Sequence, residues 1–201
     1  ESESVHDFLT REGQGCFIPA YQRGYAWDSG HVGRLLEDAT LGLERLISDS
    51  SSVRFLGSII TVRGNALVAA APPFDRELPR HVMTIIDGQQ RLTTLQLILC
   101  AFRDLARERE WKSIDKPLPR YLENADPDVM EKPAEEVYKL WPTTLNRETF
   151  KSLLTSGSAT EVANRHPLVL LGRKRKPEPR NNLVEAYLYF SAKIASWIKD
   201  T

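Results

Sequence analysis

The sequence predicts a mixed fold, in which a few short strands alternate with helices in the first half and helices dominate the second. Three observations support this prediction. They are apolar residues at helical spacing behind two N-cap residues, two short apolar runs typical of buried strands, and a long amphipathic pattern that follows the second run at once. In chain order these features occupy residues 28–48, 55–62, 81–86 and 87–110.

The chain opens with a short extended stretch and an aromatic loop. Cys16–Pro19 is apolar and ends in a proline, which cannot donate to a strand ladder. Residues 20–27 read Ala-Tyr-Gln-Arg-Gly-Tyr-Ala-Trp and are expected to form a loop. Asp28 and Ser29 are preferred N-cap residues, so the first long helix is expected to begin here and to end near Ser48.

The next predicted unit is strand, turn and helix. The run 55–62 predicts a buried strand, and the proline-containing stretch 64–80 predicts an irregular connection. The run 81–86 predicts a second strand. The polar sequence Asp-Gly-Gln-Gln-Arg at 87–91 follows immediately, and helical spacing then continues to about Glu110.

The second half is expected to be mainly helical, although prolines interrupt its first part. A short helix is expected over 134–140 and another after Asn146. The polar stretch 155–165 and the basic run 173–176 are expected to connect these to a last helix over 183–198. That helix has a broad aromatic face, and because the sequence ends just beyond it, we expect the natural protein to continue.

Length and composition are those of a globular chain. A length of 201 residues suits one domain with an appendage, or two small domains. The 41% hydrophobic and 27% charged residues are close to the average of soluble chains, which argues against wholesale disorder. Lys+Arg 27 and Asp+Glu 27 cancel, so contact with nucleic acid needs a local basic patch. No apolar run reaches the ~18 residues of a membrane span, and no signal peptide is recognisable.

Several kinds of site are excluded. Cys16 and Cys100 are far apart, and the four histidines form no ligand-spaced pair, which argues against a disulfide framework or a zinc site. A reduced, cytoplasmic protein is therefore expected. The sequence also lacks a P-loop, a dinucleotide-binding fingerprint before a helix, and a nucleophile elbow.

The sharpest functional signal is the polar run 87–91. Gly88 permits a tight turn after the strand, and the start of the next helix presents free N–H groups that favour an anion. The helix dipole disfavours a cation at Arg91, so we expect a phosphate ligand there. The Asp87 carboxylate is suited to Mg²⁺ beside substrate phosphates. Gln89 or Gln90 is expected to orient a water, since the pair has no evident packing purpose.

A simpler reading of the same residues stays open. Asp87 and Gly88 would form an ordinary turn, the two glutamines would lie in solvent, and Arg91 would pair with a nearby carboxylate.

The aromatic loop is the second candidate site. Aromatic residues interleaved with a cation suit stacking on bases and binding of phosphates. The residues concerned are Pro19, Tyr21, Gln22, Arg23 and Tyr25. In the alternative reading, Tyr25 and Trp27 are core anchors at the start of the first helix. The third candidate is a basic run, which would either contact the DNA backbone or form a solvated loop. It consists of Arg173, Lys174, Arg175 and Lys176.

Three segments resemble, in this order, the N-terminal domain of GmrSD-type restriction proteins, which carry the Asp-Gly-Gln-Gln-Arg motif. The segments are residues 17–27, 55–58 and 86–95. Shorter pieces of the second half agree, at 139–142, 146–147 and 186–197. The resemblance therefore covers nearly the whole chain. Some such proteins restrict DNA with modified bases. Others, such as SspE, which this sequence resembles most, respond to phosphorothioate in the DNA backbone.

The resemblance implies an α+β fold of ParB/sulfiredoxin type, with a small sheet and helices over 1–110 and a mainly helical extension over 111–201. That extension would lead into a C-terminal nuclease domain of HNH type. It also implies anti-phage defence, in which hydrolysis of a nucleoside triphosphate such as GTP, with Mg²⁺, gates cleavage of double-stranded DNA. The sequence has no HNH-like arrangement, so nuclease activity is not expected of it.

By the same resemblance, the expected catalytic residues are Asp87, Gln89, Gln90 and Arg91, with Asp87 as the metal ligand. The expected nucleotide-binding residues are Gly88, Thr93 and Thr94. Rival interpretations are a ParB-like switch that binds nucleotide or DNA without turnover, a sensor of modified bases, and a nuclease in its own right.

The aromatic loop also suggests how a modification is sensed. Sulfur is larger and less well hydrated than a phosphate oxygen, so an apolar pocket beside a cation would favour a phosphorothioate. Such a pocket is expected from Phe17, Pro19, Tyr21 and Tyr25, edged by Gln22 and Arg23. A flipped modified base would need matched donors and acceptors, of which the loop has few.

Overall fold

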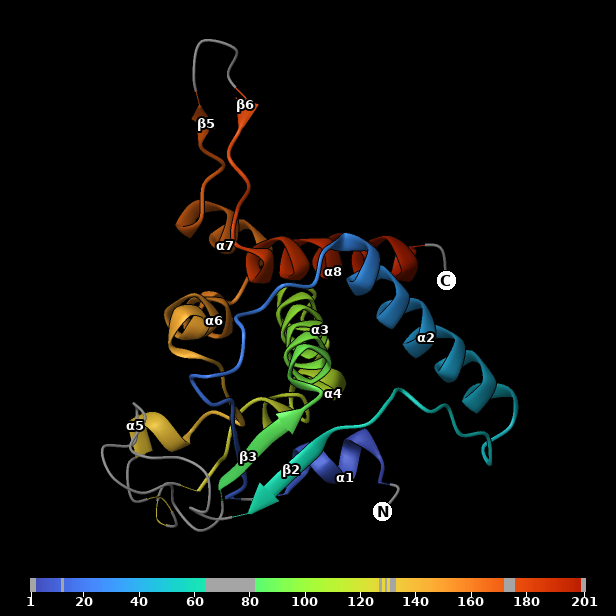
Figure 1. The fold of residues 1–201 in the computed structure, drawn as a ribbon. Coiled ribbons are helices and arrows are strands. Elements are labelled where there is room, and N and C mark those ends of the chain that lie inside the picture. The colour runs from blue at the N-terminus through green and yellow to red at the C-terminus, as the bar shows by residue number, and fades with distance from the viewer. Residues whose placement is uncertain are drawn as a thin grey trace.

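A computed structural model of the chain describes residues 3–11, 13–63, 82–126, 128, 130, 133–171 and 176–199. It confirms the predicted α+β class, with one small mixed sheet, a two-stranded hairpin and helices (Figure 1). The predicted connection 64–80 lies outside the described residues. None of the described helices is long and apolar enough to cross a bilayer.

The sheet joins strands that are far apart in the sequence. β1 (Gly15–Phe17) lies between β3 (Val82–Asp87) and β4 (Leu140–Trp141) and is parallel to both. β2 (Ile60–Arg63) pairs with β3 in antiparallel orientation and forms one edge, so the strand order is β2-β3-β1-β4. The strands predicted around Cys16 and before the Asp-Gly-Gln-Gln-Arg run are confirmed.

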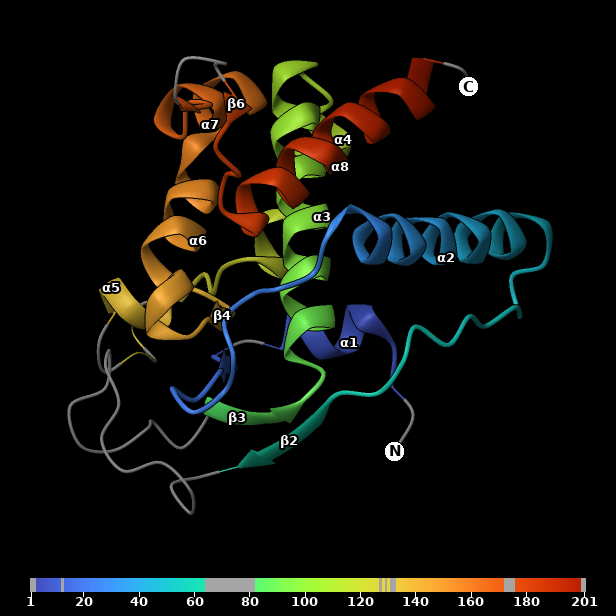
Figure 2. The same cartoon turned by 45° about the horizontal axis from the view of Figure 1, so that its top comes forward.

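The long helices stack beyond the end of β3. α3 (Gln89–Glu108) follows β3 after one glycine, and α8 (Asn182–Lys199) crosses its far end (Figures 1 and 2). α2 (Ser29–Ser48) starts beside α8 and then extends away from the body, and α6 (Thr144–Ser156) packs against α8. The three long helices predicted from apolar spacing are confirmed.

The remaining elements are short. They are α1 (Val5–Thr10), α4 (Lys112–Asp115), the 3₁₀ helix η1 (Pro119–Tyr121), α5 (Pro133–Glu136), α7 (Ala159–Arg165), β5 (Leu170–Leu171) and β6 (Lys176–Pro177). β5 and β6 form an antiparallel hairpin that projects from the body in Figure 1. Of the predicted basic run, Lys176 begins β6, and residues 173–175 lie outside the described part of the chain.

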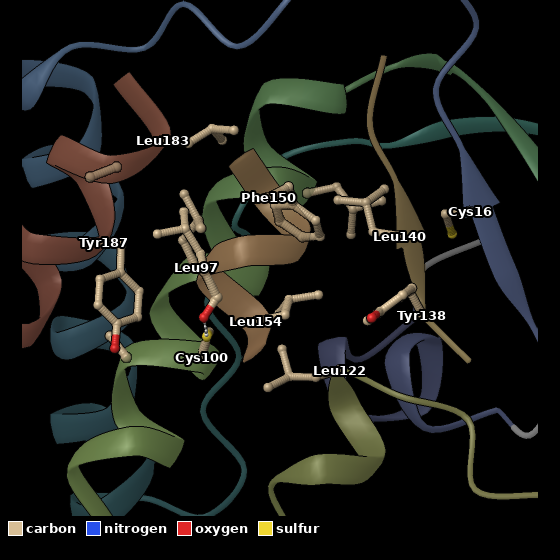
Figure 3. Close-up of a cluster of buried hydrophobic side chains, with 14 of the residues drawn as sticks. Cys16, Leu97, Cys100, Leu122, Tyr138, Leu140, Phe150, Leu154, Leu183 and Tyr187 are labelled. Atoms are coloured by element: carbon tan, nitrogen blue, oxygen red, sulfur yellow. Dashed lines mark hydrogen bonds between the residues drawn. The ribbon is translucent and has the colours of Figure 1, made fainter. Parts of the chain in front are cut away.

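One hydrophobic core holds these elements together. Leu97 and Cys100 of α3 share it with Phe150 and Leu154 of α6 and with Tyr187 of α8 (Figure 3). Each of these side chains is at most 3% exposed. Residues on both sides of the domain boundary predicted after residue 110 therefore share one core, and the boundary itself stays a prediction.

A buried ionic cluster ties α3 to α6 and α8. The Arg103 guanidinium donates to Asp104 Oδ1 at 2.8 Å and to the Leu154 carbonyl at 2.7 Å. The Tyr187 hydroxyl donates to Asp104 Oδ2 at 2.6 Å. Arg103 and Asp104 are each only 1% exposed. Burial first, and then the Asp104 charge, raise the pKa of Tyr187, which keeps its hydroxyl protonated as a donor.

The strand predicted over 55–62 was wrong in its bounds and its burial. β2 begins only at Ile60, and Phe55 and Ile60 are 78% and 51% exposed. Among the described strands β2 lies at the edge and has β3 as its single neighbour, so little of the described chain covers it. The residues before it run beside α2, where Arg54 contacts Asp38, and then beside the start of α3.

Two helix boundaries in the second half also differ from prediction. The helix predicted over 134–140 ends at Glu136, because Leu140 belongs to β4 and the Lys139 carbonyl accepts the Cys16 N–H at 2.8 Å. This pairing satisfies backbone groups of β1 that would otherwise be buried without partners. The next helix, α6, begins at Thr144, so that Asn146 lies in its first turn rather than before it.

The connecting stretch 155–165 contains a helix that the sequence reading missed. α6 ends at Gly157, which has the left-handed conformation, and α7 begins directly afterwards. The Ser158 hydroxyl accepts the Glu161 N–H at 3.1 Å. A serine followed three residues later by glutamate is a recognised helix start, and the fully buried Val162 supplies the apolar anchor.

Candidate functional site

Three segments that are separate in the sequence meet at the N-terminus of α3. They are the aromatic loop at 22–26, residues 57–59 before β2, and residues 87–94. Asn146, in the first turn of α6, joins them by accepting the Tyr25 N–H at 2.7 Å. These are largely the same stretches that carry the resemblance noted above, and the fold brings them into contact.

The start of α3 leaves three backbone donors open. Gly88 has φ 87°, a left-handed conformation, and no side chain caps the helix. The first bond of the helix runs from the Leu92 N–H to the Gly88 carbonyl at 3.0 Å, so within the described residues no backbone carbonyl accepts the N–H groups of Gln89, Gln90 and Arg91. A Cβ at Gly88 would lie 2.7 Å from the Ser58 carbonyl oxygen. Glycine is therefore required here for both conformation and space.

Backbone atoms of the segment before β2 hold the Arg91 side chain at this end of the helix. Its guanidinium donates to the Ser58 carbonyl at 2.7 Å. Gly57 has φ 107°, and a Cβ there would lie 2.4 Å from Arg91 Cζ, so the guanidinium rests directly against the glycine. Within the described residues Arg91 forms no ion pair, so the carboxylate partner of the simpler reading is not found among them. The cation lies where the helix dipole disfavours it, as expected of a residue that binds an anion.

The two glutamines are buried and fasten the aromatic loop to α3. Gln90 Oε1 accepts the Ala26 N–H at 2.8 Å, and its Nε2 donates to the Gly24 carbonyl at 3.1 Å. Gln89 Nε2 donates to Gln22 Oε1 at 3.1 Å. The side chains are 7% and 8% exposed, so the expectations that they lie in solvent and lack a packing purpose were wrong.

Tyr25 and Thr94 form a second link between loop and helix. Thr94 is fully buried and its hydroxyl donates to the Gln90 carbonyl at 2.7 Å, so the Tyr25 hydroxyl is the donor in their 2.8 Å contact. Burial raises the pKa of Tyr25 to about 12, although the Thr94 hydrogen bond opposes this shift. Tyr25 is therefore a neutral anchor, as the alternative reading of the loop expected.

A small pocket lies between the loop and α3. Polar and apolar side chains together form its wall, and no carboxylate is among the described lining residues. Its lining residues are Ile18, Arg23, Tyr25, Gln89, Gln90, Thr93, Pro142, Thr143 and Asn146.

The apolar pocket expected for sulfur is not formed as predicted. Phe17 is 1% exposed and belongs to the core, Pro19 is buried, and Tyr25 faces Thr94. Phe17 belongs to β1, which lies inside the sheet, so its side chain cannot line a pocket on the surface of the loop. The prediction of this pocket was wrong for that reason. Tyr21, 65% exposed, and the exposed Arg23 remain as its outward-facing side chains.

Asp87 is an exposed carboxylate at the end of β3, one residue before the open N–H groups. Within the described residues no cluster of three or more His, Cys, Asp or Glu side chains forms a metal site. A lone exposed carboxylate meets the usual need of Mg²⁺, which commonly binds one or two carboxylates together with substrate oxygens.

Asn146 is the site residue that sequence reasoning missed as a functional candidate. It was identified only as part of a short piece of the family resemblance, because a polar residue in a first helical turn has many ordinary roles. The contact with Tyr25 spans more than a hundred residues of sequence, and no spacing pattern reports it.

Comparison with known families agrees with this geometry. The family model of the GmrSD restriction endonuclease N-terminal domain matches residues 5–200. The chain belongs to this family. No curated protein is similar enough to match it. Membership in the GmrSD family confirms the family resemblance drawn from the motifs, and it identifies the chain as a domain of a restriction system.

Proposed function

We propose that this GmrSD-family domain binds and hydrolyses a nucleoside triphosphate at the N-terminus of α3 and senses modified double-stranded DNA through the aromatic loop. In the whole protein it would gate a C-terminal nuclease domain in the bacterial cytoplasm, as part of defence against phage. The observation that carries the proposal is the grouping of three open N–H groups, the Arg91 guanidinium and the Asp87 carboxylate at one helix end.

The proposed roles follow from these groups. The N–H groups of residues 89–91 bind phosphate oxygens, aided by the helix dipole. Arg91 is pre-positioned by Ser58 and Gly57, and its remaining N–H groups stabilise charge that develops on the transferred phosphoryl group. Mg²⁺ bound with the triphosphate supplies positive charge at the β- and γ-phosphates, and Asp87 would hold it.

The two glutamines of the motif have different proposed roles. Both amide atoms of Gln90 are engaged by the loop backbone, so Gln90 positions the loop. Gln89 uses its Nε2 for Gln22, and its Oε1 has no hydrogen-bond partner in the described chain. We assign that oxygen to an attacking water. Because an amide is not a base, we expect slow intrinsic turnover that a second ligand accelerates.

The loop provides a path from DNA to this site. DNA contacts on Tyr21 and Arg23 would shift the loop, and its hydrogen bonds to Gln89 and Gln90 would carry the shift to α3. We propose phosphorothioate as the modification. The exposed Tyr21 ring offers an apolar surface for sulfur, and Arg23 offers a charge for the remaining oxygens. Residues 173–176 would add contacts to the DNA backbone.

The proposal is tested by phosphate release from ATP, GTP, CTP and UTP, with phosphorothioate duplex, with unmodified duplex and without DNA. We expect release from at least one nucleotide, stimulation by the modified duplex, and loss of release in Asp87→Ala. Glu108→Ala is the matched control, because it removes an exposed carboxylate at the other end of α3.

Two outcomes would change the proposal. Nucleotide binding without release would favour the non-hydrolysing switch, which agrees with the absence of a base among the two glutamines. Equal stimulation by both duplexes would remove phosphorothioate as the signal while leaving the hydrolytic site in place.

A further inference from the structure

Two adjacent threonines in α3 differ in a way that points to a ligand. Thr94 is fully buried, and its hydroxyl contacts both Gln90 and Tyr25. Thr93 is 3% exposed and lines the pocket, yet within the described residues no hydrogen bond engages its hydroxyl. The hydroxyl oxygen is accessible from the pocket, so an external acceptor or donor can reach it.

Two more donors face the same pocket. Asn146 is 7% exposed and uses its Oδ1 to accept the Tyr25 N–H, which leaves its NH₂ group without a partner among the described residues. Arg23 also lines the pocket, and in the described part of the chain its guanidinium makes neither a hydrogen bond nor an ion pair. The pocket thus presents a hydroxyl, an amide NH₂ and a guanidinium, all open.

This set of donors selects an anion. The one cation has no carboxylate in the pocket lining to neutralise it, and a phosphate has several oxygens that can accept from different directions. We propose that Arg23, Thr93 and Asn146 form a phosphate-binding subsite on the face of α3 turned away from Arg91. The subsite rests on the proposed function, because it extends the same helix end. The phosphate belongs either to the nucleotide or to the DNA backbone.

Asn146 gives the sharpest test. Asn146→Asp keeps the oxygen that accepts the Tyr25 N–H but replaces the NH₂ donor with negative charge, so the loop anchor survives and a phosphate is repelled. Thr93→Val removes the open hydroxyl at nearly constant volume. Thr40→Val is its matched control, because the Thr40 hydroxyl donates to the Leu36 carbonyl within α2 and Thr40 is not part of the pocket lining.

The measurement is calorimetric titration of the 201-residue chain with tripolyphosphate and, separately, with a short unmodified DNA duplex. We expect Asn146→Asp and Thr93→Val to weaken one of the two probes, by about tenfold for Asn146→Asp. Thr40→Val should leave both affinities unchanged. Loss for tripolyphosphate assigns the subsite to the nucleotide, and loss for the duplex assigns it to the DNA backbone.

The inference is wrong if Asn146→Asp and Thr93→Val bind both probes as the unmodified chain does. Loss of tripolyphosphate binding in Arg91→Ala alone would then leave the proposed function standing. If the unmodified chain binds neither probe, both proposals fail. Thermal melting checks the fold of each variant, and if Asn146→Asp does not fold, the comparison of Thr93→Val with Thr40→Val decides.

Discussion

Replacing Arg91 with alanine is expected to lower the rate of nucleotide hydrolysis by about two to three orders of magnitude, the usual loss when one pre-positioned charge-stabilising donor is removed. The guanidinium is fixed by the Ser58 carbonyl and by close contact with Gly57, so the charge is held in place before a ligand binds. Stability should fall little, because the substitution removes one hydrogen bond of a half-buried side chain. Steady-state phosphate release and thermal melting measure the two effects.

Arg91→Lys separates charge from geometry. Lysine keeps the positive charge but lacks the planar fork that can contact Ser58 and a phosphate together, so we expect most of the rate to be lost. Turnover in Arg91→Ala equal to that of the unmodified chain would exclude Arg91 from catalysis. Loss of turnover together with loss of folding would point to a structural role instead.

The largest effect on stability is expected from Arg103→Met. Among the described residues, this change leaves the Asp104 carboxylate with only the Tyr187 hydroxyl and one weak contact from the Cys100 thiol, and removing one partner of a buried pair costs about 3–5 kcal/mol. It also leaves the Leu154 carbonyl without its donor. For a chain of this size, we expect the melting temperature to fall by about 10 °C.

A double variant shows whether the unpaired charge is the cause. Arg103→Met combined with Asp104→Asn buries no net charge, so part of the lost stability should return. Arg109→Ala, which removes an exposed cation just beyond α3, should be nearly neutral. A single Arg103→Met variant that melts like the unmodified chain would contradict the importance given to this cluster.

The long helices and central strands follow from local patterns, and these were predictable. The helix from Ser29 to Ser48 agrees with its N-cap and apolar spacing, and α3 agrees with the amphipathic pattern after the strand. The sequence did not predict the exposed segment before β2 or the short strand β4, because the conformation of both depends on tertiary neighbours. Phe55 is apolar but lies uncovered, and Leu140 is extended because β1 needs a partner.

The location of the candidate site was also predictable, since a helix that begins directly after a glycine presents free N–H groups that favour an anion. The use of its side chains was not. Gln90 fastens the loop through two backbone contacts, and only the fold shows that its amide faces Gly24 and Ala26. Asn146 and the open Thr93 hydroxyl likewise depend on contacts made across the sequence, which no spacing reveals.

The most direct test of the triphosphate site is an amide NMR titration of the chain with Mg²⁺ and a non-hydrolysable GTP analogue. If the triphosphate binds at the N-terminus of α3, the N–H signals of Gln89, Gln90 and Arg91 will show the largest shifts, and Gly88 will follow. Saturable shifts centred elsewhere, for example on the β5–β6 hairpin, with these signals unmoved, would contradict the proposed site.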